Sequence, residues 1–136
     1  MKYKFLDKIM SDVMFEAYGK SLKEVFENAA EALFSVICEL KKVKPKEKEE
    51  YGFKAENAEE LMMNWLQGLI AIVDVEQKFF SKFDIYEIDE RHLKAKCYGE
   101  GIRPEIGGTV VKAVTQYKYK FEKTKEGYKV MVSLDI

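Results

Sequence analysis

The sequence predicts an α+β fold, a two-layer sandwich in which one mixed or antiparallel β-sheet packs against two helices. Two long segments carry apolar residues at helical spacing, and several others alternate apolar and polar residues with a period of two. The order is strand, helix, short strand, helix and then several strands. This grouping favours an α+β domain over a parallel α/β fold.

Both expected helices begin at a capping residue. In KSLKEVFENAAEALFSVICEL, Ser21 followed by Glu24 forms a capping box, and in ENAEELMMNWLQGLIAIVDVEQ the pair is Asn57 and Glu60. The apolar stripe of the first helix comprises Leu22, Val25, Phe26, Ala29, Ala30, Leu33, Phe34, Ile37 and Leu40. That of the second comprises Leu61, Met62, Trp65, Leu66, Leu69, Ile70 and Val73.

Strands are expected where apolar residues alternate with polar ones. The segments are DVMFEAY, which ends at Gly19, then FSKFDIYEI, HLKAKCYGE, TVVKAVTQYKYKF and YKVMVSLDI. The stretch KKVKPKEKEE is interpreted as a solvated loop between helix and strand rather than as a phosphate-binding arm.

Length and composition indicate a single domain spanning residues 1–136, because 136 residues with 47% hydrophobic content can bury one core. The net charge of −1 argues against tight binding to nucleic acid or an anionic membrane, although it leaves a local patch open. The start MKYKFLDKI is too short and too charged for a signal peptide, and no apolar run is long enough to span a membrane. Cys38 and Cys97 lie in apolar periodic segments and are interpreted as buried, reduced thiols, which favours the cytoplasm.

The sequence holds few residues suited to independent catalysis. The single histidine, His92, stands where a strand begins and is expected at the surface. GEGIRPEIGGT lacks the lysine and following helix of a phosphate-binding loop, so its glycines are interpreted as turn residues. No metal-binding pattern of cysteine and histidine is present. We therefore expect a protein that is not itself an enzyme.

Carboxylates at the two ends of the chain are the candidate site. Tyr128, Val130, Val132, Leu134 and Ile136 share one parity and should face the core. Asp135 therefore points to the other side, and Asp12 alternates in the same way with Val13. If the two strands are neighbours, Asp12, Asp135 and the main-chain carboxylate of Ile136 converge, and a hard divalent cation would offset their repulsion. The alternative is two exposed acids without a common role, which spacing alone favours.

Asp74 and Glu76 follow the apolar stripe of the second helix. As a default they simply end that helix, but acids at this position oppose the helix dipole. Asp74 is therefore kept as a contributor to an acidic face.

Together these segments resemble the archease family, accessory proteins of RNA-splicing ligases. The resemblance rests on the ordered series SDVMFEAYGKSLKEVFENAAEALF, NAEELMMNWLQGLIAIVDVE, YGEG, GTVVKAVT and VSLDI. The family motif His-Thr-Ala-Asp matches its acid to Asp12, and the family's terminal Asp-Ile matches Asp135 and Ile136. The chain departs from the family at Ile9, Met10 and Ser11, at Gln116 and Tyr117, and at Asn64.

The resemblance implies a non-enzymatic activator of an RtcB-type, GTP-dependent RNA ligase that joins 3′-phosphate ends in tRNA splicing. Such a protein would promote guanylylation of the ligase and its turnover. The implied metal site consists of Asp12, Asp135 and Ile136 with calcium, magnesium or manganese, and direct binding to nucleic acid or membrane is not expected. The alternative is a chaperone-like interaction module for RNA-modifying enzymes, in which the acids are only structural.

Overall fold

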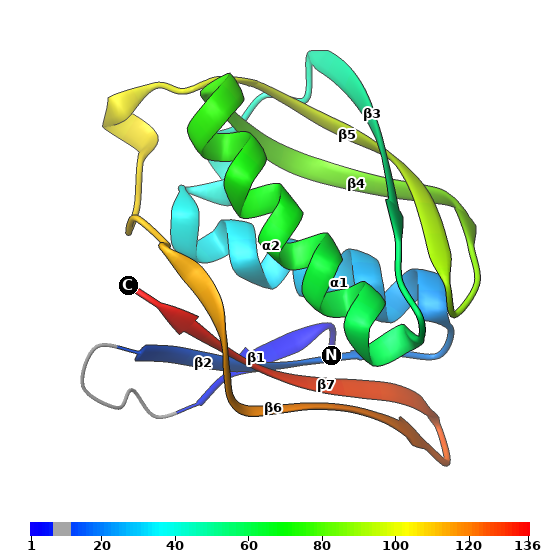
Figure 1. Ribbon diagram of the computed structural model, residues 1–136. Coiled ribbons are helices and arrows are strands. Elements are labelled where there is room, and N and C mark those ends of the chain that lie inside the picture. The colour runs from blue at the N-terminus through cyan, green and yellow to red at the C-terminus, as the bar shows by residue number, and fades with distance from the viewer. Residues whose placement is uncertain (7–11) are drawn as a thin grey trace.

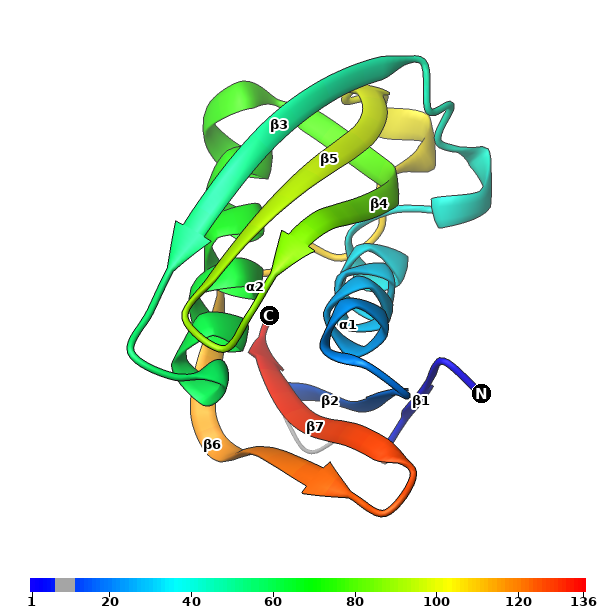
Figure 2. The same cartoon turned by 90° about the vertical axis from the view of Figure 1, so that its right-hand side faces the viewer.

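In the computed structural model of the protein, two helices lie between two antiparallel β-sheets (Figures 1 and 2). The structure describes residues 1–6 and 12–136. The helices are α1 (Leu22–Ile37) and α2 (Ala58–Glu76). The strands are β1 (Tyr3–Phe5), β2 (Asp12–Gly19), β3 (Glu47–Lys54), β4 (Lys78–Ile88), β5 (His92–Gly101), β6 (Ala113–Thr124) and β7 (Gly127–Asp135).

The α+β class, the two helices and the antiparallel pairing are confirmed, but the strands form two sheets where one was expected. One sheet has the order β1-β2-β7-β6 and the other β3-β5-β4. Helix α1 packs against β2 on one side and β4 on the other, so the helices form a middle layer. Period-two alternation is the same whether strands share a sheet or not, and therefore does not reveal this division.

Both predicted helix starts are confirmed. The backbone N–H of Glu24 donates to Ser21 Oγ at 3.2 Å, and that of Glu60 donates to Asn57 Oδ1 at 2.9 Å. The first helix ends earlier than its apolar stripe suggested, because Cys38 is extended and forms a β-bridge with Gly107. Leu40 then belongs to a short 3₁₀ turn, Leu40–Lys42.

The core lies between the helices and both sheets. Trp65 of α2 is fully buried, and its Nε1 donates to the carbonyl of Phe26 at 3.0 Å, which ties α2 to α1. Phe83 of β4 packs against both Trp65 and Phe34 of α1. Rings of this size bury a large apolar area, so the cluster fixes the helices relative to the upper sheet in Figure 1.

Two elements differ from the sequence prediction. The stretch KKVKPKEKEE is only partly a loop, since β3 begins at Glu47. Strand β1 was not predicted, because a three-residue strand shows too little alternation to be recognised; it pairs with β2 through Phe5 opposite Phe15.

Strand β6 leaves the β7 ladder for a few residues. Thr115 is opposite Ser133 and Lys120 is opposite Met131, so the four residues between Thr115 and Lys120 face a single residue of β7. Ser133 Oγ donates to the carbonyl of Tyr117 at 3.0 Å and holds this excursion against β7.

Candidate metal centre

Asp12 and Asp135 lie at opposite ends of the sequence and directly opposite each other in the sheet. Strands β2 and β7 pair antiparallel along the whole of β2, with Asp12 in register with Asp135. Side chains of directly opposed residues leave the same face, with Cβ atoms about 4.5–5.5 Å apart. The predicted pairing of these two strands is therefore confirmed, whereas metal binding stays a prediction.

The two acids lie on the face of the sheet that points away from the helices. Val130, Val132 and Leu134 of β7 are fully buried, as are Phe15 and Ala17 of β2. Asp12 and Asp135 have the opposite parity and are half-buried. The predicted direction of Asp135 is thus confirmed.

Asp135 is held firmly because β7 is an inner strand. On its other side Asp135 is in register with Ala113 of β6, and the backbone N–H of Lys112 donates to the carbonyl of Asp135 at 2.8 Å. Ile136 follows directly, half-buried, with its side chain against the edge of the core. The main-chain carboxylate predicted as a third ligand belongs to Ile136, the residue next to Asp135.

No cation neutralises this pair within the part of the chain that the structure describes. Glu16, on the same face of β2, shows the contrast: its carboxylate has Lys4 Nζ at 3.6 Å and Lys129 Nζ at 3.8 Å. It also accepts a hydrogen bond of 2.8 Å from Tyr18, and burial together with this carboxylate raises the pKa of Tyr18 to about 12. Glu16 is therefore a satisfied structural acid, whereas Asp12 and Asp135 have no such partners among the described residues.

Asp12 and Asp135 offer carboxylate oxygens, the type of ligand that hard divalent cations prefer. Two carboxylates about 4 Å apart repel by about 1 kcal/mol in water and about 4 kcal/mol at an effective dielectric of 20. Calcium, magnesium and manganese prefer such oxygen ligands. Among residues 1–6 and 12–136, no group of three His, Cys, Asp or Glu side chains could hold a metal. Among the described residues, the candidate for a third ligand is the main-chain carboxylate of Ile136.

The other singled-out titratable residues lie elsewhere. His92 begins β5, half-exposed as expected, with Nε2 2.6 Å from Glu87 and Nδ1 2.9 Å from Asp89. The Glu87 carboxylate, and then Asp89, raise the pKa of His92. Cys38 and Cys97 are buried and free, as predicted.

The family departures have different positions. Ile9, Met10 and Ser11 lie outside the described residues. Gln116 and Tyr117 belong to the excursion of β6. Asn64 is structural, because its Nδ2 donates to the carbonyl of Lys54 at 2.9 Å and ties α2 to β3.

Asp74 takes part in a feature separate from the acid pair. It is exposed in the last turn of α2 and lines a hollow of about 200 Å³, to which Asp12 and Asp135 do not contribute. The structure therefore does not unite Asp74 with the candidate metal centre.

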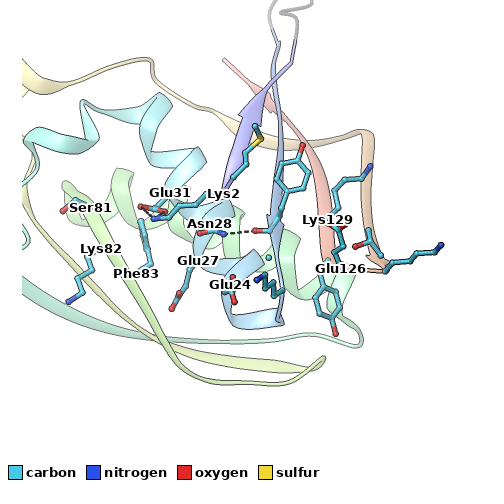
Figure 3. A pocket seen from close by; sticks show the side chains of 17 residues that line it. Lys2, Glu24, Glu27, Asn28, Glu31, Ser81, Lys82, Phe83, Glu126 and Lys129 are labelled. Atoms are coloured by element: carbon cyan, nitrogen blue, oxygen red, sulfur yellow. Dashed lines mark hydrogen bonds and ion pairs between the residues drawn. The ribbon is translucent and has the colours of Figure 1, made fainter.

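A hollow of about 1040 Å³ opens at the other end of β2 and β7 (Figure 3). Tyr18 lines it and stands six residues from Asp12 along β2, which corresponds to about 20 Å. Within its lining, Lys2 Nζ lies 3.0 Å from Glu31, and Asn28 Nδ2 donates to the Tyr18 carbonyl at 2.7 Å. Sequence reasoning missed it because α1, β4 and the β6–β7 turn form it jointly.

Comparison with known proteins gives a consistent result. The sequence model of the Archease protein family matches residues 3–136. Protein archease of Methanosarcina acetivorans is 39% identical over 141 residues, covering 99% of this chain and 96% of the relative. Protein archease of Sulfurisphaera tokodaii is 37% identical, covering 99% of both chains.

Solved structures agree with this fold. The solution structure of Methanobacterium thermoautotrophicum protein 1598 superimposes with a TM-score of 0.83 at 32% identity, covering 98% of each chain. A crystal structure from Thermotoga maritima, described as an archease and possible chaperone, gives a TM-score of 0.70 at 21% identity, covering 96% of this chain and 98% of that one. Within the described residues, no helix combines the length and hydrophobicity needed to cross a bilayer.

Proposed function

The chain belongs to the archease family, and on that premise we propose that it is an accessory protein that activates an RtcB-type, GTP-dependent RNA ligase in tRNA splicing. It would promote guanylylation of the ligase and restore its turnover without catalysing a reaction itself. The observation that carries this proposal is the register of Asp12 with Asp135, two half-buried acids with no cation beside them among the described residues.

The role of this chain would be to hold and present a divalent ion. Asp12 and Asp135 would each supply a carboxylate from a paired strand, and Ile136 would supply the main-chain carboxylate. Calcium, magnesium or manganese bound there would neutralise phosphate charge at the nucleotide site of the ligase. The inner position of β7 keeps the Asp135 backbone fixed, so no ordering of that strand is needed on binding.

The remaining expectations follow from bulk properties. Direct binding of nucleic acid is not part of the proposal, because the net charge is −1. The two buried free thiols fit a reducing compartment, and we propose the cytoplasm.

The test is single-turnover guanylylation of the purified RNA ligase encoded in the same genome. We expect wild-type protein to accelerate the step, and Asp12→Ala and Asp135→Ala to lose at least about tenfold of that stimulation, since each removes a metal ligand. Glu122→Ala is the matched control, an acid on β6 paired with Lys129 at 3.8 Å, and should stimulate normally.

A residue appended after Ile136 tests the third ligand, because it converts the carboxylate to an amide. Stimulation that survives both aspartate substitutions and the added residue would end the metal-based proposal.

A second candidate is a chaperone-like module, favoured by the description of the Thermotoga maritima relative as a possible chaperone. In that case the acids would be structural. Protection of the ligase against aggregation should then survive Asp12→Ala and Asp135→Ala and be insensitive to chelators. Loss of protection in either variant would count against it.

A further inference from the structure

The hollow at the C-terminal end of α2, here called the α2 groove, has the size and lining of a site for one side chain. Its volume of about 200 Å³ is below the roughly 300–1,000 Å³ of small-molecule pockets. Apolar side chains dominate the lining, among them Ile37, Ile70, Val73, Phe79 and Val110, and Asp74 is its acidic residue.

At the rim of this groove, the backbone holds an apolar side chain in a solvent-exposed position. Val110 is 74% exposed, although its neighbours are fixed. The N–H groups of Gly108 and Thr109 donate to the carbonyls of Ile37 and Val36 at 2.8 and 2.9 Å. A Cβ on Gly108 would collide with the Val36 carbonyl, so the segment needs glycine to lie this close to α1. Val110 is thus presented on a rigid support.

The groove also carries negative charge that nothing among the described residues offsets. Asp74 stands in the last turn of α2, where no basic residue occurs and the helix dipole is already negative. Its neighbour Glu76 accepts a hydrogen bond from Tyr51 at 3.2 Å, but no cation lies within 4 Å of Asp74 in the described part of the chain. An acid in this position is destabilising, because it lies at the negative end of the helix dipole. A cation supplied by a partner would offset that destabilisation.

The α2 groove and the acid pair lie at the same end of β6. Val111 lines the groove, the N–H of the next residue, Lys112, donates to the Asp135 carbonyl, and Ala113 is in register with Asp135. A partner seated in the groove would therefore be close to Asp135.

We propose that the α2 groove is the docking site for a partner protein, which inserts one apolar side chain beside Val110 and places a lysine or arginine against Asp74. An apolar anchor in a small pocket with an adjacent charge pair is the usual form of an interface hot spot. This inference rests on the proposed function in taking the RNA ligase as the partner, and it assigns docking to residues other than the candidate metal ligands.

The first experiment measures the Kd for the purified ligase. Val110→Asp places a charge at the apolar rim and Asp74→Lys reverses the attraction, so each should raise Kd at least about tenfold. Tyr86→Asp and Glu90→Lys are matched controls, an exposed hydrophobic residue and an exposed acid on the three-stranded sheet and its turn. Both controls should bind like the wild type.

Comparing a variant of a candidate metal ligand with a variant of the groove distinguishes docking from activation. Asp12→Ala should bind the ligase with nearly normal Kd but fail to stimulate guanylylation. Val110→Asp should stimulate normally once its concentration exceeds the raised Kd. If wild type and both groove variants bind equally, the groove proposal is overturned while the proposed function stands.

A second experiment tests peptide binding at the groove in the absence of the ligase. Short random peptides displayed on phage are selected on wild-type protein and counter-selected on Val110→Asp. We expect peptides with an apolar residue next to lysine or arginine, and their binding should fall with Asp74→Lys. If the ligase does not bind wild type, the proposed function fails. The peptide selection then tests by itself whether the groove is a docking site.

Selection of no such peptide, or of peptides that bind the Val110→Asp variant equally, overturns the groove proposal. Self-association of wild type that Val110→Asp abolishes, measured by sedimentation, would also overturn it, because the occupant would then be a second copy of the chain.

Discussion

Asp12 and Asp135 differ from Glu16, their neighbour on the sheet, because no cation lies beside them among the described residues. On the same face of the sheet, Glu16 lies near two lysines and a tyrosine hydroxyl. The two aspartates face each other in register with no such neighbours among the described residues. Like charges placed opposite each other destabilise a sheet. Such a cost without a visible structural gain is typical of functional positions.

We predict that Asp135→Asn slightly stabilises the protein when a chelator is present, by about 0.5–1 kcal/mol, because it removes repulsion at a half-buried site. Excess calcium or manganese should raise the melting temperature of wild type but not of the variant. Thermal unfolding with and without each ion is the measurement. An equal ion-induced shift in both proteins would contradict shared binding by the acid pair.

At the scale of elements, close packing decides which residue occupies the middle of helix α2, at the expense of helix propensity. Gly68 lies in the middle of α2, where glycine costs about 1 kcal/mol relative to alanine. A Cβ at Gly68 would collide with the ring of Phe53 from β3. Phe53 in turn packs edge-on against Trp65 at 5.6 Å, so it has little freedom to move away.

We predict that Gly68→Ala destabilises the protein by about 1 kcal/mol net. The overpacking cost of about 1–3 kcal/mol exceeds the gain in helix propensity. Chemical denaturation measures the free energy of unfolding, and Gly68→Ala combined with Phe53→Leu should recover much of the loss. Ala71→Gly, at an exposed position of the same helix, reports the propensity effect alone. A stabilised Gly68→Ala variant would show that Phe53 moves aside freely.

At the scale of the whole molecule, the helix layer between two sheets buries groups that titrate in alkaline solution. Burial raises the pKa of both Cys38 and Cys97 to about 12. In the unfolded chain a thiol ionises near pH 8.5. Between these values the folded state binds more protons than the unfolded state, so stability falls as pH rises.

We predict that the contribution of the two thiols to stability is complete below about pH 8.5 and is lost progressively toward pH 12. The slope is about 1 kcal/mol per pH unit for each thiol. Denaturant unfolding as a function of pH measures it, and the double variant Cys38→Ala, Cys97→Ala should show a shallower decline. Tyr51, whose pKa is also raised by burial, adds to the decline at higher pH. Identical slopes in both proteins would contradict the prediction.

The sequence alone determined the elements whose signals are local. The caps at Ser21 and Asn57 start the helices where they were predicted, because a hydrogen bond between residues three positions apart needs no distant partner. The inward parity of β7 followed from alternation for the same reason. Family membership could also be inferred, because the quoted motifs occur in a fixed order along the chain.

Only the tertiary structure decided which distant residues meet. Strand alternation assigns side chains to faces but names no partner strand, so the split into two sheets and the pairing of Asp12 with Asp135 required the fold. The α2 groove is built from both helices, β4 and the segment after β5, and no stretch of sequence contains it. Periodicity reports which way a side chain points within its own element, whereas a site depends on packing between elements.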